Sequence, residues 1–400
     1  MSLELSKKAL AVKPSSTLAI TAKANELKAA GQDVVGFAAG EPDFATPEHI
    51  CQAAKDAIDS GFTKYTAASG TPELKAALSK KFKEENGIDY APDQIVISNG
   101  GKHSLTNVFE AILNEGDEVI IPAPYWLSYP EIVKLAGGVP VIIRGEKSAS
   151  YKVTADQIAA ACTEKTKALV LNSPSNPTGM IYSKEELEAI AKVAIEKDFY
   201  VVSDEIYEHL YYVEGKNTSI ASLGEEIYNR TITVNGLAKS YAMTGWRIGF
   251  CGAPKAIAKC ISSIQSHQTS NPNSIAQKAA LAAISGDQTC VTEMGKAFDE
   301  RRQYMYKRVC ECPYISCIEP KGAFYVFVDM NEMVGKKYKG REITCAADVA
   351  EILIADYCVA LVPCADFGFP DHFRMSYAIS VDKIKKGMDR IEEFAKSLTD

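Results

Sequence analysis

The chain of 400 residues has no block rich in lysine and arginine, and its formal net charge is −7. Nucleic acid is therefore not an expected partner. It also lacks any apolar stretch of the roughly eighteen residues that a membrane span needs, because long uncharged runs such as the one from Ala168 are interrupted by asparagine and proline. We expect no membrane-spanning segment.

The opening segment "MSLELSKKALAVKPSS" lacks the continuous apolar core of a signal peptide. The 11 cysteines are odd in number, irregularly spaced and without a CxxC pair, and a chain of this size does not need disulfides to fold. The cluster Cys310, Cys312 and Cys317 has no histidine at ligand spacing, so incidental thiols are favoured over a zinc site. We expect reduced thiols, a cytoplasmic location and no metal centre.

Hydrophobic residues at 46% and charged residues at 24% are typical of globular proteins, and 400 residues exceed the usual size of a single core. Two β-branched runs, residues 94–98 and 117–122, enclose a segment of helical periodicity at 102–113. The same alternation recurs further on, with strands predicted at 167–174, 199–207, 231–236 and 246–254 and a helix at 183–198. This order predicts an α/β fold with a mostly parallel sheet flanked by helices.

The pattern changes from about Gly286. The expected elements there are a long charged helix at 293–311, a strand at 322–329, a helix at 345–357, a strand at 374–378 and a last helix at 381–398. We predict a large domain over residues 46–290 and a smaller α+β domain formed by residues 291–400 together with 1–45, which include an N-terminal arm.

Ligands of parallel sheets bind beyond the carboxyl ends of the strands. After the first strand, Gly100 and Gly101 open a helix whose free N–H groups would bind an anion such as phosphate, although such glycines also serve simple turns. A nucleotide P-loop is excluded, because its pattern needs glycine at Val96 and serine or threonine at His103.

Three further strand ends carry unusual residues. Trp126, near Tyr125 and Tyr129, belongs either to the core or to a surface that stacks on a flat ring. Asn176 lies in "SPSNPTG", which is either a turn or a source of an amide for a ligand. Asp204 follows a buried strand, where an unpaired carboxylate is costly, so we expect it to have a cationic partner.

Lys239 follows the next strand, in "NGLAKSYAMTGWRIG". One chemical task needs all these groups together, namely holding a phosphorylated pyridine aldehyde as an electron sink. A desolvated lysine among small residues loses its proton easily and can act as nucleophile and base. Asp204 would keep the ring nitrogen protonated, Tyr207 would contact the phenolic oxygen, and Arg247 would bind the phosphate.

The stretch "GLAKSYAMTGWRIG" resembles the pyridoxal-phosphate attachment motif of class I aminotransferases. The resemblance covers nearly the whole chain, through "KPSSTLAITAKANEL", "AAGEPDF", "KYTAASG", "SNGGKHSL", "PYWLSYP", "NSPSNPTG", "VSDEIYEHL", "GAFYVF" and "FRMSYA". The chain is most similar to the bacterial-type aspartate aminotransferase subgroup, of which some members also use prephenate. The resemblance implies a fold type I enzyme that depends on pyridoxal 5'-phosphate.

The resemblance also implies roles for individual residues. Lys239 would attach the cofactor and move the proton, with Asp204 at the ring nitrogen and Tyr207 at the phenolic oxygen. The other residues implied to bind the cofactor are Trp126 by stacking, Asn176 at an oxygen, and Arg247, Gly100, Gly101 and the Lys102 backbone at the phosphate. The serines that many relatives place beside the lysine are Gly236 and Ala238 here.

Substrate contacts follow by the same resemblance. Arg374 would clamp the α-carboxylate beside Trp126 and Asn176, Gly40 would close over the substrate, and Lys102 would bind the side-chain carboxylate of aspartate. Lys13 and Thr17 match positions linked to prephenate, although a lysine on an N-terminal arm is also explained by simple solvation. Tyr65 would reach the phosphate of a neighbouring subunit, which implies a homodimer with shared active sites.

The implied activity is ping-pong transfer of an amino group between aspartate, or a similar amino acid, and 2-oxoglutarate. Prephenate or broad aromatic specificity is the alternative, and a β-lyase on the same scaffold is a further one. A cofactor-binding regulator would need an added basic DNA-binding segment. An inert scaffold would not bring so many costly polar groups together.

Overall fold

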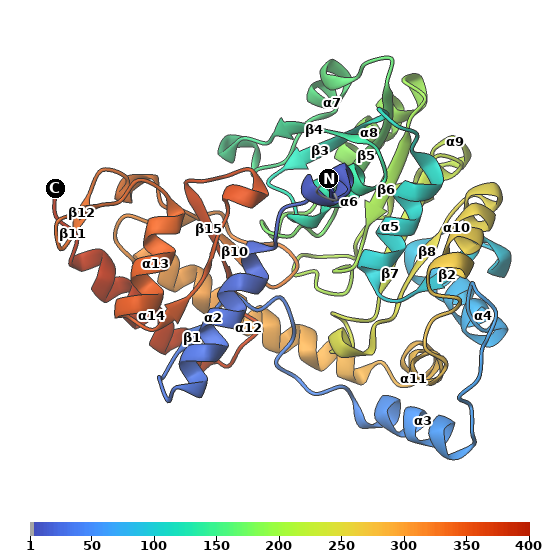
Figure 1. The fold of residues 1–400 in the computed structure, drawn as a ribbon, viewed down its shortest axis with the longest axis horizontal. Helices are drawn as coiled ribbons and strands as arrows, with labels where there is room; N and C mark the ends of the chain where they lie inside the picture. Colours follow the sequence, from blue (N-terminus) through green and yellow to red (C-terminus); the bar gives the residue numbers. More distant parts are fainter. Residues whose placement is uncertain (1–3) are drawn as a thin grey trace.

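The computed structural model describes residues 4–400 (Figure 1). Its largest feature is a seven-stranded sheet in the order β2-β8-β7-β6-β5-β3-β4. The strands are β2 (Ile95–Ser98), β3 (Glu118–Ala123), β4 (Val139–Arg144), β5 (Thr166–Asn172), β6 (Tyr200–Asp204), β7 (Thr231–Gly236) and β8 (Gly249–Gly252). All neighbours pair in parallel except β8, which is antiparallel to both β2 and β7. The prediction of a mostly parallel sheet is confirmed.

Helices cover both faces of this sheet, because its strands are apolar on both sides. Val96 of β2 packs with α5 and α10, whereas its neighbours Ile95 and Ile97 pack with α3, α4 and α11 on the other face. The flanking helices are α3 (Glu48–Asp59), α4 (Pro72–Lys81), α5 (Gly101–Ile112), α6 (Ser128–Leu135), α7 (Ala155–Ala161), α8 (Lys184–Glu196), α9 (Glu225–Tyr228), α10 (Lys255–Gln268) and α11 (Ser274–Ser285).

The C-terminal part, on the left in Figure 1, contains a four-stranded antiparallel sheet in the order β14-β15-β10-β9. Helix α12 (Thr289–Glu311) packs on β9, β10 and α14. The elements of this part are β9 (Ser316–Cys317), β10 (Tyr325–Asp329), β11 (Lys337–Tyr338), β12 (Arg341–Glu342), α13 (Ala346–Asp356), β13 (Val359–Ala360), β14 (Val362–Pro363), β15 (His372–Ser376) and α14 (Val381–Lys396).

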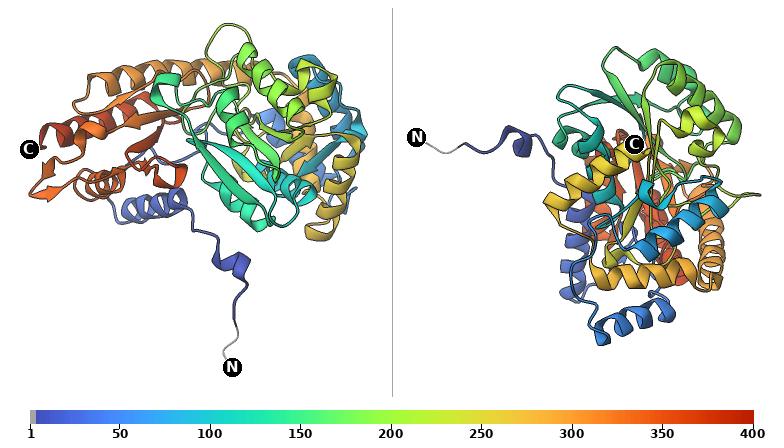
Figure 2. Two further views of the ribbon diagram at one scale, coloured as in Figure 1. Left: turned by 90° about the horizontal axis from the view of Figure 1, so that it is seen from above. Right: turned by 90° about the vertical axis from the view of Figure 1, so that its right-hand side faces the viewer.

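The N-terminal segment lies with this C-terminal part. Strand β1 (Val35–Gly36) pairs in parallel with β13, and α2 (Ser16–Ala29) contacts β13 and β14. The preceding helix α1 (Lys7–Leu10) projects from the body as an arm (Figure 2). Within residues 4–400, none of the helices combines the length and the apolar character required to cross a bilayer.

Most predicted elements lie within a few residues of the observed ones, but the strand predicted from Trp246 begins only at Gly249. Trp246 ends a 3-10 turn, and Arg247 adopts a left-handed conformation with φ of 55°. β8 can start at Gly249 because glycine has no side chain. A Cβ at this position would lie 2.2 Å from the backbone nitrogen of Gly101, which is too close. The sequence analysis made no prediction for β4 or for the helices α2, α3, α4, α6, α7, α9, α10 and α11.

Candidate active site

A cavity of about 430 Å³ lies at the carboxyl edge of the seven-stranded sheet, where β10 and β15 of the smaller sheet face it. Its wall combines side chains from distant parts of the chain. They include Asn176, Asp204, Lys239, Arg247, Tyr325 and Arg374. This is the place that the parallel topology predicts for a ligand.

Lys239 lies half-buried in the loop between β7 and β8. Its Nζ donates a hydrogen bond to the carbonyl oxygen of Gly40 and lies 5.9 Å from the centre of the Tyr207 ring. Burial and the positive charge of Arg374 lower the pKa of the Lys239 amine to about 8. The amine is therefore much easier to deprotonate than an exposed lysine.

Asp204 ends β6 and is buried below the same cavity. Its Oδ2 accepts a hydrogen bond of 2.7 Å from the Tyr129 hydroxyl, and its Oδ1 accepts one of 3.3 Å from the amide of Ile206. Burial raises the pKa of Asp204, while the Tyr129 bond and the charge of Lys239 oppose that rise. In the described chain the carboxylate is thus held by a tyrosine and a backbone amide, and the predicted cationic partner is not among its hydrogen-bond donors.

Tyr207 and Tyr325 meet at the cavity wall, with 2.9 Å between their hydroxyl oxygens. Burial, together with the neighbouring Tyr325 hydroxyl, raises the pKa of Tyr207 well above its ordinary value. The Tyr207 phenol therefore stays protonated, and its one proton is available either to the Tyr325 oxygen or to an acceptor in the cavity.

A cradle suited to an anion forms where α5 begins. Gly100 has φ of 94°, and a Cβ there would lie 2.3 Å from a terminal guanidinium nitrogen of Arg247. Arg247 reaches this place because β8 runs antiparallel, which puts the start of β8 at the carboxyl edge of the other strands. The first N–H groups of α5 have no partner within the helix and, with the guanidinium, are suited to bind an anion.

Arg374, on β15, is only 2% exposed. One terminal nitrogen donates to Asn176 Oδ1 at 2.9 Å and the other to the carbonyl oxygen of Ala38 at 3.0 Å. Its guanidinium lies 4.3 Å from the centre of the Tyr325 ring, and its buried Nε has no hydrogen-bond partner in the described chain. This buried cation is suited to an incoming carboxylate.

Lys102 and Trp126 line the cavity together. The Lys102 ammonium lies 4.9 Å from the centre of the Trp126 ring, which itself packs edge-to-face on Tyr129. Burial and the nearby charge of Arg247 lower the pKa of Lys102. Lys102 is thus placed to meet a negatively charged side chain beyond the Trp126 ring.

Three of the sequence-predicted residues are not part of the cavity wall, and one of them, Gly100, directly precedes Gly101, which is. Tyr65, between α3 and α4, is 88% exposed. Lys13 lies on the arm, where its backbone N–H donates to Glu131 Oε2 at 3.0 Å. Thr17 and Gly40, by contrast, are part of the cavity wall, and the buried Thr17 hydroxyl has no hydrogen-bond partner among the described residues.

The sequence analysis assigned no role to Tyr129, Asn172 or Tyr325. Asn172 ends β5, donates to the Asp204 carbonyl oxygen at 2.9 Å and accepts from the Asn176 amide at 2.8 Å. Its position at a strand end was the available signal. The local sequence gave no signal for Tyr129 or Tyr325, because both lie in runs of aromatic residues that are equally typical of a hydrophobic core.

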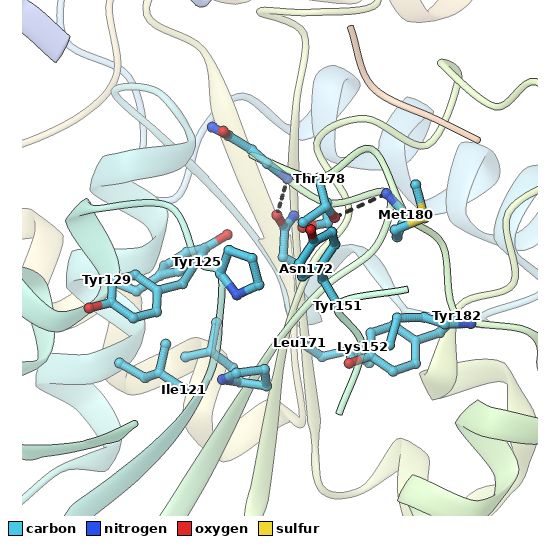
Figure 3. A pocket seen from close by; sticks show the side chains of 15 residues that line it. Ile121, Tyr125, Tyr129, Tyr151, Lys152, Leu171, Asn172, Thr178, Met180 and Tyr182 are labelled. Carbon is cyan, nitrogen blue, oxygen red and sulfur yellow. Dashed lines mark hydrogen bonds between the residues drawn. The ribbon is translucent and has the colours of Figure 1, made fainter. Parts of the chain in front are cut away.

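A second, small cavity lies behind Asn172 (Figure 3). Its volume of about 30 Å³ suffices for a water molecule but not for an aromatic ring. In Figure 3, Thr178 and Met180 lie beside Asn172, and the Thr178 hydroxyl accepts a bond of 3.1 Å from the Met180 amide. The bonds of Asn172 and Thr178 fix the loop that carries Asn176. The residues around the small cavity therefore position a residue of the main site.

Residues 32–391 match the family described as aminotransferase class I and II, and the chain belongs to that family. It is 47% identical over 398 residues to the aspartate aminotransferase of Geobacillus stearothermophilus, covering 99% of this chain and 100% of the relative. It is 46% identical to the aspartate/prephenate aminotransferase of Cereibacter sphaeroides, covering 97% and 98%.

Solved structures agree with this membership. The aspartate aminotransferase from Rhizobium meliloti superposes with a TM-score of 0.96 at 40% identity and full coverage of both chains. The Thermus thermophilus aspartate aminotransferase with maleate gives a TM-score of 0.92 at 42% identity, covering 98% of this chain and 100% of that one. The fold is therefore that of an aspartate aminotransferase.

Proposed function

We propose that the chain is a pyridoxal 5'-phosphate-dependent aminotransferase that moves an amino group between aspartate, or a similar amino acid, and 2-oxoglutarate. The observation that carries this proposal is the easily deprotonated Lys239 amine in the same cavity as the buried Asp204 carboxylate. The names of the aspartate aminotransferase relatives support it.

The residues present fit this cofactor. The cradle of Gly100, Gly101 and Arg247 would hold the phosphate, and a side chain at Gly100 would fill it. Asp204 would face the ring nitrogen, whose proton would supply the cationic partner that the buried carboxylate otherwise lacks. Trp126 would lie against the ring.

When bound, the cofactor supplies an electron sink for the bond that breaks at the substrate α-carbon. Lys239 would attach the cofactor, and its neutral amine, when free, would take the proton from the substrate α-carbon and deliver it to the neighbouring carbon. Asp204 would stabilise positive charge at the ring nitrogen. Tyr207 donates from its protonated phenol, and Asn176 orients Arg374.

Arg374 would bind the substrate α-carboxylate, which all amino acid and 2-oxo acid partners share, beneath the backbone of Gly40. Lys102 would bind the second carboxylate of aspartate, glutamate and their oxo acids. Lysine is a point charge without a fixed fork, so it accepts carboxylates of different reach. The maleate in the Thermus thermophilus relative, a dicarboxylate, supports two cationic contacts in this cavity.

The test of this function is incubation of the purified, cofactor-loaded protein with aspartate and 2-oxoglutarate. We expect glutamate and oxaloacetate in equal amounts. Pyruvate and ammonia from a cysteine conjugate, without glutamate, would instead identify a β-lyase. An inactive protein that still binds the cofactor would contradict the proposal.

Prephenate is a second candidate substrate. Thr17 is part of the cavity wall and its buried hydroxyl has no hydrogen-bond partner among residues 4–400, and the Cereibacter sphaeroides relative is named as an aspartate/prephenate aminotransferase. Lys13 would contribute only if the arm that carries it moves toward the cavity. Adding prephenate as acceptor in the same assay, with wild type and Lys13→Ala, tests both points.

The Lys102→Met variant should lose activity toward aspartate selectively, because it keeps the length of the side chain and removes its charge. We expect kcat/KM for aspartate to fall by about 10- to 100-fold, the range for a hydrogen bond to a charged group. The value for phenylalanine should change by less than about threefold. Lys102→Arg, which keeps the charge, is the matched control, and equal losses for both substrates would remove Lys102 from the distal carboxylate.

We further propose a homodimer with shared active sites, in which the exposed Tyr65 ring reaches the partner's cofactor phosphate. Its 88% exposure in one chain, away from that chain's own cavity, supports this role. The large domain would comprise residues 46–290 and the small one residues 291–400 with 1–45, because β1 and α2 pack on β13. We also propose that the protein is located in the cytoplasm.

A further inference from the structure

Behind Lys239, three side chains from separate segments form a continuous hydrogen-bonded chain. His209, in the loop after β6, lies with Nε2 2.9 Å from Glu85 Oε2 and with Nδ1 3.0 Å from Ser240 Oγ. Glu85 belongs to the π-helical turn Phe82–Asn86, and Ser240 directly follows Lys239.

This order of carboxylate, imidazole and hydroxyl resembles the one that activates a serine nucleophile. Ser240, however, is only 4% exposed, and it is not part of the cavity wall, although its neighbours Ala238 and Lys239 are. A substrate cannot reach its hydroxyl. These three hydrogen-bonded side chains can therefore affect the reaction only through Lys239.

The same region does not form a metal site either. Ligand atoms of Glu85, Glu208 and His209 lie within 4.8 Å of one another. The buried ammonium of Lys81 bonds to Glu208 and lies 3.6 Å from Glu85, and Asn86 also donates to Glu208. The place that a metal ion would take between these carboxylates is therefore already held by the Lys81 ammonium.

The hydrogen bond at the Glu85 end of this series has a defined direction. Burial acts to raise the pKa of Glu85, but the hydrogen bond from His209 and the charge of Lys81 hold it below its ordinary value. An ionised carboxylate only accepts, so Nε2 of His209 donates to Glu85, and Nδ1 lies 3.0 Å from Ser240 Oγ on the other side of the ring. The Lys239 loop is thereby tied to Glu85, which lies 3.6 Å from the ammonium of the buried Lys81–Glu208 ion pair.

We propose that His209 is a positioning residue. Its hydrogen bond to Ser240 fixes the backbone next to Lys239 and thereby the position of the Lys239 amine in the cavity. The inference rests on the proposed function, because it assigns His209 an effect on the residue that attaches the cofactor. Loss of one fixed contact next to a reacting group is enough to displace it by a fraction of an ångström, which slows a reaction considerably.

Two variants of His209 separate its two hydrogen bonds. In His209→Asn the amide oxygen takes the place of Nδ1 and keeps the bond to Ser240. In His209→Gln the amide nitrogen takes the place of Nε2 and keeps only the bond to Glu85. A role in holding Lys239 predicts rescue by asparagine alone, whereas a general structural role predicts rescue by either variant or by neither.

Each cofactor-loaded variant is compared with wild type in two measurements, kcat for aspartate and the pH midpoint of the bound cofactor's visible absorption. We expect His209→Asn to stay within about threefold of wild type and His209→Gln to lose about tenfold or more in kcat, with a displaced midpoint. Equal behaviour of the two variants, or an unchanged midpoint in both, would overturn the inference.

Ser240→Ala provides the second check. It should lower the activity of the His209→Asn variant to the level of His209→Gln, and add little to His209→Gln, because both routes remove the same bond. Additive losses would contradict the proposed path. Wild-type protein without transaminase activity would refute the proposed function. The role of His209 is tested separately, by the differences between the variants in the pH midpoint of the cofactor absorption.

Discussion

Replacing Lys239 with alanine is expected to abolish transamination, with kcat for aspartate falling by about 10⁴-fold or more, at the upper end of what proton-transfer catalysis contributes. The variant loses both the amine that holds the cofactor and the base that moves the α-proton. Borohydride reduction should fix the cofactor on Lys239 of the wild type, as shown by peptide mass spectrometry, and should fix none on that peptide of the variant.

The pH dependence of cofactor capture tests the same residue in the cofactor-free protein. The pKa of Lys239 is lowered to about 8, so the neutral amine becomes more abundant as the pH rises and is the major form above that value. The capture rate should rise about tenfold per pH unit below pH 8 and level off above it. A rate that kept rising toward the ordinary lysine pKa of about 10.4 would show that the capturing amine is not the buried one.

Arg247→Gln serves as a matched control for Lys239→Ala. It weakens the phosphate cradle but leaves the Lys239 amine in place. We expect weaker cofactor binding with a retained borohydride adduct at saturating cofactor. An adduct of wild-type yield in Lys239→Ala, on any other lysine, would refute the assignment of Lys239.

Neutralising Asp204 is expected to have the second largest effect. Asp204→Ala should reduce kcat by about 10²- to 10³-fold, the cost of removing a preorganised electrostatic contact to developing charge. The cofactor should still attach to Lys239, because that amine and the phosphate cradle are intact. Stopped-flow measurement of the half-reaction with aspartate would locate the loss in proton removal.

Two further substitutions test the cause of that loss. Asp204→Asn keeps the shape and removes the charge, so it should behave like alanine. Tyr129→Phe keeps the Asp204 carboxylate but removes its 2.7 Å hydrogen bond, and should cost about tenfold. Near-normal turnover of Asp204→Asn, with cofactor bound, would show that the negative charge is not needed.

Local sequence predicted the elements well where pattern and burial agree. β7 is observed over the predicted residues 231–236, because "TITVNG" is buried throughout and can form only a strand in this context. α5 and α14 were also located to within a few residues, since their apolar spacing is helical. The edge strand β4 was missed because half-exposed residues weaken the pattern.

The candidate residues themselves were found from strand ends and from family motifs, and most of them line one cavity. Their partners were not found. The bonds between Tyr129 and Asp204, Tyr207 and Tyr325, and Arg374 and Asn176 join residues 75, 118 and 198 positions apart. The cation expected at Asp204 is not one of its hydrogen-bond donors, which are a tyrosine hydroxyl and a backbone amide, although burial raises the pKa of Asp204 and the charge of Lys239 opposes that rise.

The sequence by itself determined six of the seven strands of the large sheet, the helices α5 and α8, the family and the chemical groups available, because these depend on side-chain type and on neighbours a few positions away. Only the tertiary structure decided which groups meet. The antiparallel entry of β8 brings Arg247 to Gly100, and the docking of β10 and β15 lowers the pKa of Lys239 by burying it beside Arg374. Proximity across the chain and the loss of water follow from packing, which no local pattern encodes.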